Sequence, residues 1–171
     1  MKTILAVTLA AVVASCASMG QGQGASAVAN LEPTTGNSTK GTVTFTQHGD
    51  TVRVKAQLSG LTPGAEHGFH VHEKGDCSSG DGMSAGGHYN PAGTPHGAQA
   101  DAHHAGDMPN LKADSYGNAS ASFKLSGVSV GSGPADVVGK GLIVHRDPDD
   151  YKSQPVGNAG PRLACAVIQM R

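Results

Sequence analysis

The sequence predicts an all-β domain: an eight-stranded antiparallel Greek-key flattened barrel or sandwich with two long functional loops. Short segments alternate between apolar and polar positions, and turn residues separate them. The 171 residues include 25 glycines, only 4% aromatic residues and no tryptophan, which suits many turns around a core of small aliphatic side chains. Beyond the N-terminus no ten-residue stretch keeps a 3.6-residue period, so we expect little helix.

The first residues carry the features of an export signal. Met1 and Lys2 precede an apolar stretch at residues 4–14, which is too short to span a bilayer as a helix, and small residues follow it. These features predict a signal peptide at residues 1–16, a flexible Gly/Gln/Ser linker at 17–26 and one domain at 27–171. We therefore expect the protein in the periplasm or cell envelope.

Cys16 lies at the expected cleavage site and allows two outcomes. The letters VASC at residues 13–16 resemble a bacterial lipobox, which would leave Cys16 as a lipid-modified N-terminus anchored to the membrane. The small residues around Cys16 also fit an ordinary signal-peptide site, after which the protein would be secreted without a lipid. We expect the lipoprotein, because it explains a cysteine at this position.

Strand patterns follow one another along the rest of the chain. Residues 25–31 form an expected edge strand that ends before Pro33, and residues 42–47 and 51–58 form a hairpin around a turn at 48–50. Further strands are expected at 68–73, 119–125, 140–145 and 163–169. The segments 74–106 and 146–161 lack apolar periodicity and are too long for plain turns, so we expect them to be functional loops.

Charge and cysteine content restrict the function classes. The formal net charge is −1 and no block of like charges occurs, which argues against nucleic acid or anionic lipid as a partner. With Cys16 set aside, Cys77 and Cys165 form an even pair in a chain expected to be exported. This pair predicts a single disulfide, with two separate buried thiols as the alternative.

Histidine is concentrated in one part of the chain, with seven of the nine between His67 and His104. Imidazole is the commonest metal ligand and is largely neutral near pH 7. His70 and His72 lie two apart on an expected strand, so they project from one face about 6.5–7 Å apart and could bind one ion. His67 has the opposite parity and is expected to be a hydrogen-bonded structural residue, and His48 is expected to be solvated in a turn.

A second set of ligands lies on the loop 74–106. His88, His96 and one of His103 and His104, together with Asp107, would make a tetrahedral zinc site. Spacing alone does not choose between His103 and His104. Because the histidines are too many for one tetrahedral ion, the sequence predicts two metals.

Four motifs then identify a family. In order they are GFHVHE at 68–73, GHYNP at 87–91, HAGD at 104–107 and GNAGPRLAC at 157–165. Together they closely resemble the copper,zinc superoxide dismutases, in particular the exported bacterial branch, over roughly residues 27–171. This family is a standard example of the β-sandwich, so once the resemblance is stated the expected fold is no longer independent of it.

The resemblance implies a copper site and a zinc site that share the imidazolate of His88. The copper ligands would be His70, His72, His88 and His145, and the zinc ligands His88, His96, His104 and Asp107, which leaves His103 as a neighbour. Asp149 would connect a copper ligand to a zinc ligand and so orient both rings. Cys77 and Cys165 match the disulfide of the family.

The implied reaction is dismutation of superoxide to dioxygen and hydrogen peroxide. Copper would accept and return the electron, because zinc has no accessible redox change. His88 would carry a proton in each cycle, and Arg162 would attract the small anionic substrate. The resemblance is compatible with a homodimer. The competing hypothesis is a non-enzymatic copper/zinc carrier on the same fold, which the loss of a ligand or of Arg162 would indicate; all of them are present.

Overall fold

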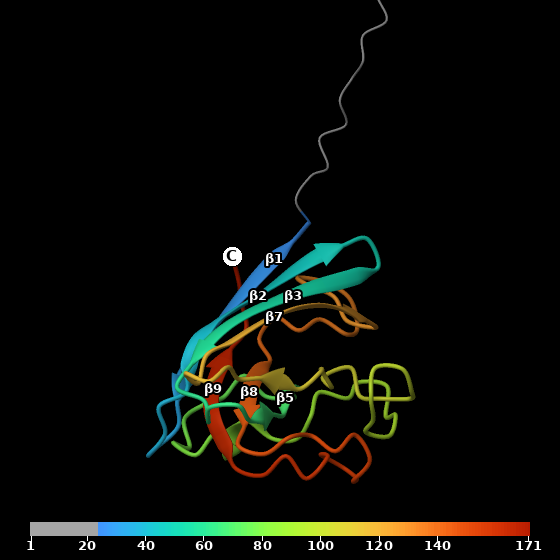
Figure 1. The fold of residues 1–171 in the computed structure, drawn as a ribbon. Coiled ribbons are helices and arrows are strands. Elements are labelled where there is room, and N and C mark those ends of the chain that lie inside the picture. The colour runs from blue at the N-terminus through green and yellow to red at the C-terminus, as the bar shows by residue number, and fades with distance from the viewer. Residues whose placement is uncertain (1–23) are drawn as a thin grey trace, which may run out of the picture.

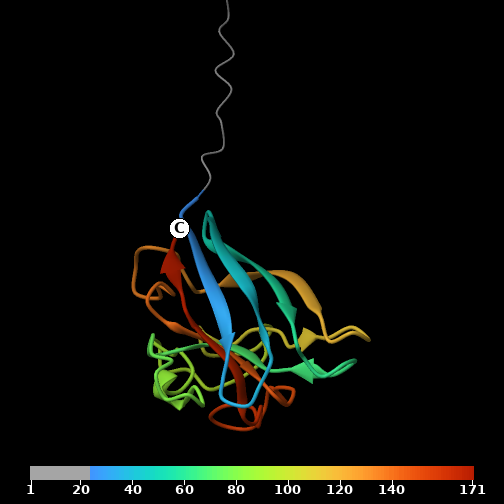
Figure 2. The ribbon, with the colours of Figure 1, turned by 90° about the vertical axis from the view of Figure 1, so that its left-hand side faces the viewer.

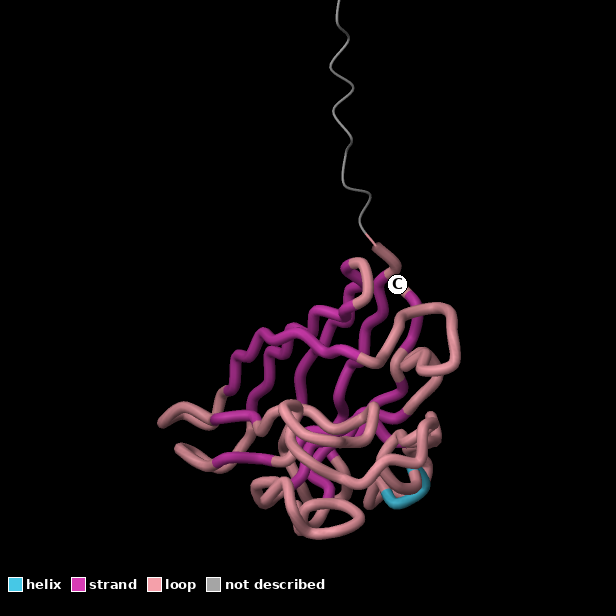
Figure 3. The backbone as a smooth tube through the Cα atoms, turned by 90° about the vertical axis from the view of Figure 1, so that its right-hand side faces the viewer, coloured by secondary structure: helices cyan, strands magenta, loops and turns pink. Residues whose placement is uncertain are grey.

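The computed structural model describes residues 24–171, so the expected signal peptide, Cys16 and most of the expected linker lie outside the described residues. The described chain forms ten strands and one short 3-10 helix, Met83–Ala85, and its strand pairs are antiparallel. Figure 3 shows strands and loops making up nearly all of the backbone. The all-β prediction is therefore confirmed. Among these residues, no helix has the length and apolar character needed to cross a membrane.

Eight strands form one sheet that folds over on itself. They are β1 (Ser26–Pro33), β2 (Lys40–His48), β3 (Thr51–Ser59), β5 (Phe69–His72), β7 (Ala119–Ser126), β8 (Gly141–His145), β9 (Arg162–Val167) and β10 (Gln169–Met170). The order in the sheet is β5-β8-β9-β1-β2-β3-β7, with β10 also paired to β1. Figure 1 shows β1, β2, β3 and β7 as one layer, with β5, β8 and β9 facing it.

Two details differ from the sequence-based expectation. β4 (Glu66–His67) and β6 (Leu111–Lys112) form a separate two-stranded sheet, and strands of two residues are too short to show a period. The expectation that the first strand is an edge strand is wrong, because β1 lies between β2 on one side and β9 and β10 on the other. Pro33 is tolerated there because the N–H of Thr34 donates on the β9 side, so the nitrogen of Pro33 faces the β2 side, where pairing ends at Leu31 and no ladder hydrogen bond is lost.

β2 and β3 form the expected hairpin, paired from Lys40 and Ser59 to His48 and Thr51 around a two-residue turn. Gly49 in this turn has φ 61°, a conformation that favours glycine. After β3 the chain crosses to the other edge of the sheet at β5 and later returns to place β7 beside β3, which is a Greek-key type of connection. The two long loops gather at one end of the molecule, the end away from residue 24 (Figures 1 and 2).

The two layers enclose a core of small aliphatic side chains. Val43, Phe45 and Val54 contribute from one layer, and Phe69 and Val71 of β5 contribute from the other. Because successive side chains of a strand point to opposite faces, the same β5 presents its two histidines on its outer face. All four residues of β5 are buried, since the loop 74–106 covers that outer face. The expected ligands therefore lie on a strand that packing holds on both sides.

Candidate metal centre

Four histidine side chains meet on the outer face of β5 and β8. His70 and His72 come from β5, His145 ends β8, and His88 comes from the loop 74–106; all four are buried. One nitrogen from each ring lies within 4.8 Å of the others. The ring centroids of His70 and His72 are 6.3 Å apart, close to the spacing that the strand period predicts. His145 joins them because β8 pairs with β5, which leaves its Nε2 3.4 Å from Nε2 of His72.

A second buried group is arranged around the carboxylate of Asp107. Oδ1 lies 2.8 Å from Nδ1 of His88 and 3.3 Å from Nδ1 of His104, and Oδ2 lies 3.0 Å from Nδ1 of His96. The four side chains again bring one ligand atom each to within 4.8 Å of one another. Between the two candidates that the spacing left open, the structure brings His104 into this group.

His88 belongs to both groups. Its Nδ1 faces Asp107, and its Nε2 is buried and has no hydrogen-bond partner. The ring stacks on His70, with the centroids 3.9 Å apart. An imidazole with one nitrogen directed to each group is the arrangement that a ligand shared by two ions requires.

Asp149 connects the two groups from outside. Its Oδ2 lies 2.8 Å from Nε2 of His70, and its Oδ1 lies 2.9 Å from Nε2 of His96. The carboxylate is fully buried and accepts a further hydrogen bond from the backbone N–H of Tyr151. Because the Nε2 of each ring donates to the carboxylate, the Nδ1 of each ring is left with its lone pair directed inward.

Backbone carbonyls orient the other two rings of the first group. Nδ1 of His72 lies 2.9 Å from the carbonyl oxygen of Gly86, and Nδ1 of His145 lies 3.0 Å from that of Gly160. Each ring donates at Nδ1 and so presents Nε2 to the centre. The long loops therefore supply both ligands and the acceptors that select the tautomers of the strand histidines.

The residues fit a copper and a zinc ion. Buried polar atoms in proteins are normally hydrogen-bonded, yet several ring nitrogens here are not. The unpartnered nitrogens of the two groups are His70 Nδ1, His88 Nε2, His96 Nδ1 and His104 Nδ1. Inward lone pairs without donors call for cations. Four imidazoles suit copper, and three imidazoles with one carboxylate suit tetrahedral zinc.

The electrostatics favour the protonation states that bind metal. Burial lowers the pKa of His145 to about 4 and, with the neighbouring rings, lowers the pKa values of His70 and His72 well below the usual range. Burial by itself would raise the pKa of Asp107, but hydrogen bonds from His88 and from backbone N–H groups outweigh it and lower that pKa. At neutral pH these imidazoles are neutral and the carboxylate is ionised, as coordination requires.

Arg162 lies beside the first group. It begins β9 and pairs directly with His145 on β8. Its guanidinium donates hydrogen bonds to the carbonyl oxygens of Gly82 and Gly86, so Arg162 and His72 share one acceptor. Burial lowers the pKa of Arg162, but a guanidinium stays charged in proteins. A fixed positive charge therefore lies next to the four-histidine group.

The expected disulfide is confirmed. Cys77 and Cys165 are bonded, with their Cα atoms 5.8 Å apart. Cys165 packs with Ala85 and Ile143 in a small separate cluster. The bond ties the loop 74–106 to β9, three residues beyond Arg162, and so connects the loop carbonyls to the strand that carries the guanidinium.

The remaining histidines lie outside both groups. His67 is fully buried, and its Nδ1 lies 2.9 Å from the carbonyl oxygen of His145, so the expected structural role is confirmed. Its Nε2 has no hydrogen-bond partner. Nδ1 of His103 contacts the carbonyl oxygen of Asp101 at 2.7 Å. His48 is exposed at the end of β2, as expected for a solvated residue.

Two amide side chains that sequence reasoning missed hold ligand segments in place. Gln154 accepts from the backbone N–H of His96 at 2.9 Å and donates to its carbonyl oxygen at 2.8 Å. Asn110 makes the same reciprocal pair with the backbone of Asp149, at 2.9 Å in both directions. The partners are 58 and 39 residues apart in the sequence, so no local pattern could have indicated either contact.

Comparisons with known proteins agree with this geometry. The family model for copper/zinc superoxide dismutase (SODC) matches residues 39–168. The chain is 41% identical to "Superoxide dismutase [Cu-Zn]" of Paramecium bursaria Chlorella virus 1 over 150 residues, which cover 84% of this chain and 77% of the viral protein. It is 43% identical to "Superoxide dismutase [Cu-Zn] 2" of Aquifex aeolicus (strain VF5) over 123 residues, 69% of this chain and 72% of that protein.

A solved structure supports the fold. The crystal structure of the clock protein EA4 superimposes with a TM-score of 0.79 at 37% sequence identity, and it covers 87% of this chain and 96% of that protein. The folded sheet, the two adjoining candidate metal-binding groups and the disulfide are thus accompanied by sequence similarity over most of the described residues. On these grounds the chain belongs to the copper/zinc superoxide dismutases, oxidoreductases that act on superoxide with copper and zinc as cofactors.

Proposed function

We propose that this chain dismutes superoxide to dioxygen and hydrogen peroxide with copper in the four-histidine group and zinc in the group around Asp107. The observation that carries the assignment is His88, which presents one nitrogen to each group. His70, His72, His88 and His145 would hold copper, and His88, His96, His104 and Asp107 would hold zinc. Bound copper supplies one-electron redox chemistry, and zinc, which has no accessible redox change, supplies charge and order.

His88 is the residue that we assign to proton transfer. Its Nδ1 is engaged with Asp107, so Nε2 is the atom at which the ring can hold and release a proton. The other rings have outer partners that fix their orientation, since Asp149 and the carbonyl of Gly86 accept from the nitrogens that face away from the centre. Because Asp107 holds Nδ1 of His88 and the neighbouring rings are fixed, His88 can take up and release a proton at Nε2 while its ring stays in position.

Arg162 is assigned to binding of the superoxide anion. A net charge of −1 gives the molecule little long-range attraction for an anion, so local charge must provide it. Gly82 and Gly86 occupy two donors of the guanidinium and hold it in place, and the group has five N–H donors in all. The remaining donors are available to a small anion beside the four-histidine group.

One purified sample tests the assignment. Copper and zinc content and the rate of superoxide decay are measured together, and we expect one copper and one zinc per chain with fast decay. Both metals without catalysed decay would refute the dismutase and favour a metal carrier. His88→Ala should also uncouple the ions, so that the copper spectrum no longer changes when zinc is removed. An unchanged response would show that His88 is not shared.

A charge reversal tests Arg162. Arg162→Glu should lower the decay rate while both metals stay bound, and Arg53→Glu, the same change on the outer surface of β3, should have little effect. Raising salt from 0.01 to 0.15 M shortens the screening length from about 30 to 8 Å. The wild type should then slow down and Arg162→Glu should speed up. A fully metallated Arg162→Glu with the wild-type rate at low salt would remove Arg162 from the proposal.

We also propose that the protein acts in the cell envelope through a lipid on Cys16, where it would protect that compartment from superoxide. The support is the VASC motif after an apolar segment, as in bacterial lipoproteins. Mass spectrometry of the native N-terminus is the test. An unmodified start at Ser18 would indicate simple secretion.

A further inference from the structure

The outer surface of β3 and β7 carries a cluster of positive charge, in the layer that does not hold the metal ligands. Arg53 and Lys55 lie on β3 and Lys124 lies on β7, and all three are exposed. Arg53 pairs directly with Lys124 across the two strands. Lys55 is two residues beyond Arg53 and so projects from the same face. We call Arg53, Lys55 and Lys124 the basic face.

Carboxylates are absent from the strands around the basic face. β2, β3 and β7 contain no aspartate or glutamate. Glu32 lies near the end of β1, Asp50 lies in the β2–β3 turn, and every other acidic residue of the chain lies between positions 66 and 150. Among residues 24–171 the ion pairs of lysine or arginine are Lys112–Glu66 and Arg146–Asp147. The basic face is therefore left without a neutralising partner in this part of the chain.

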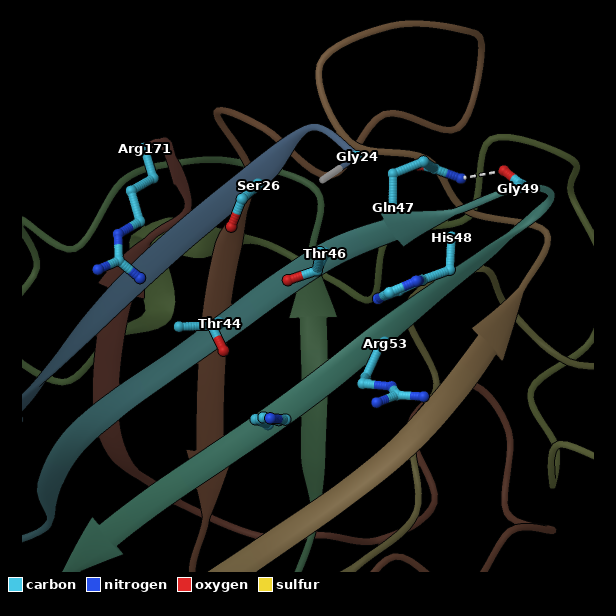
Figure 4. Close-up of a pocket in the computed structure, with 10 residues that line it drawn as sticks. Gly24, Ser26, Thr44, Thr46, Gln47, His48, Gly49, Arg53 and Arg171 are labelled. Atoms are coloured by element: carbon cyan, nitrogen blue, oxygen red, sulfur yellow. Dashed lines mark hydrogen bonds between the residues drawn. The ribbon is translucent and has the colours of Figure 1, made fainter. Parts of the chain in front are cut away.

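The arrangement itself calls for an anion. Like charges directly opposite each other on neighbouring strands repel, and a bound anion would relieve the repulsion between Arg53 and Lys124. The surroundings are polar, because hydroxyls of Thr44 and Thr46 line one shallow hollow of about 810 Å³ together with Arg53 and Lys55. Figure 4 shows Thr46, His48 and Arg53 close together on this surface. Arginine, lysine and hydroxyl groups together suit a phosphate, whose oxygens accept hydrogen bonds from all three.

The course of the chain indicates which anionic surface is near. Gly24, the first described residue, lines the same hollow as Arg53. Residues 17–23 can span at most about 25 Å when fully extended, so a lipid on Cys16 would keep the hollow close to the bilayer. The long loops that carry the metal centre lie at the opposite end of the molecule (Figure 1).

We propose that the basic face binds anionic phospholipid headgroups and orients the anchored domain with its metal centre away from the membrane. This orientation draws on the lipid proposed for Cys16 but not on the dismutase activity. The sequence argued against anionic lipid because it contains no block of like charges. Strand register nevertheless places Lys124 beside Arg53, although 71 positions separate them, and so assembles a cluster that the linear sequence does not show.

Sedimentation with vesicles tests the proposal on the full-length chain. Vesicles of phosphatidylcholine alone are compared with vesicles of equal parts phosphatidylcholine and phosphatidylglycerol. One variant combines Arg53→Gln, Lys55→Gln and Lys124→Gln. The matched control combines Lys74→Gln, Lys112→Gln and Lys152→Gln, which removes the same charge from exposed sites outside the sheet of the basic face. The wild type and both variants carry the same N-terminal segment, so its contribution cancels when their vesicle-binding constants are divided by one another.

Each cation near an anionic membrane strengthens binding roughly fivefold, so the basic-face variant should bind anionic vesicles on the order of one-hundred-fold more weakly than the wild type. The control variant should bind anionic vesicles with an affinity much closer to that of the wild type. Equal binding by the two variants would overturn the proposal. So would wild-type binding to heparin without a preference for anionic over neutral vesicles, which would assign the face to a soluble polyanion. Superoxide decay, measured on the same samples, separates this outcome from failure of the proposed activity.

Discussion

Replacing Gln154 with alanine tests whether the loop 146–161 holds the expected zinc ligands in position. The Gln154 amide makes two hydrogen bonds to the backbone of His96, and it is the reciprocal pairing that keeps His96 facing Asp107. Without this pairing the His96 segment gains freedom that zinc binding must then remove. We therefore expect Gln154→Ala to weaken zinc binding more than copper binding, because three of the four expected copper ligands lie on β5 and β8.

The size of the effect follows from the two hydrogen bonds. A typical intramolecular hydrogen bond contributes about 1 kcal/mol net, and water replaces part of it when the side chain is exposed, as Gln154 is. The loss should be about 1–2 kcal/mol, which corresponds to a roughly five- to thirtyfold increase in the zinc dissociation constant. Gln154→Glu should be no better than alanine, because it would set a carboxylate oxygen against the carbonyl oxygen of His96.

Competition titration with a zinc chelator measures the constant directly. Gln57→Ala is the control, since Gln57 donates an amide hydrogen bond to Ser120 on the sheet layer without metal ligands and should leave the zinc constant unchanged. A zinc dissociation constant that changes less than twofold in Gln154→Ala would refute the reasoning. Wild-type zinc affinity in Gln154→Glu would refute the reciprocal pairing in particular.

Three further outcomes are expected. Reduction of the disulfide, whose cysteines are 88 residues apart, should cost roughly 4–5 kcal/mol of unfolding free energy and loosen metal retention, and native thiols that react with an alkylating agent before any reduction would contradict the bond. Gly157→Ala should disrupt the bridge made by Asp149 and so cause metal loss, because the new Cβ would overlap Oδ1 of Asp149. Gly64→Ala is the control, since Gly64 has a similar φ of 72° but lies in open space. Equal metal loss from both variants would show that the backbone conformation alone is responsible. The free energy of unfolding of the metal-free protein should fall by about 2 kcal/mol between pH 7 and pH 5 through His145 alone. The reason is that the pKa of His145 is about 4 in the folded protein and about 6.5 in the unfolded chain, so the unfolded chain is protonated first as the pH falls. Equal unfolding free energies from denaturant titrations at the two pH values would contradict this.

Local periodicity in the sequence was sufficient to predict much of this fold. Alternation of apolar and polar residues is a property of single strands, so the β2–β3 hairpin and the shared face of His70 and His72 followed from neighbouring residues alone. The segments 74–106 and 146–161, which lack an apolar period, became the two long loops, because nothing in them could be buried in a regular way. The pairing of Cys77 with Cys165 followed from counting cysteines in a chain expected to be exported.

The features that only the tertiary structure could show depend on contacts between segments that are distant in the sequence. The central place of β1 and the pairing of β4 with β6 are set by crossovers and register, which leave no local periodic signal. The choice of His104 over His103 was likewise beyond spacing alone, and the sequence made it only through the family resemblance. The amide of Gln154 reaches His96 only once both loops have packed at one end of the sheet. The basic face arises in the same way, since the pairing of β3 with β7 brings its charges together. A residue's own pattern determines which face of a strand it occupies, whereas the path of the whole chain determines what lies opposite that face.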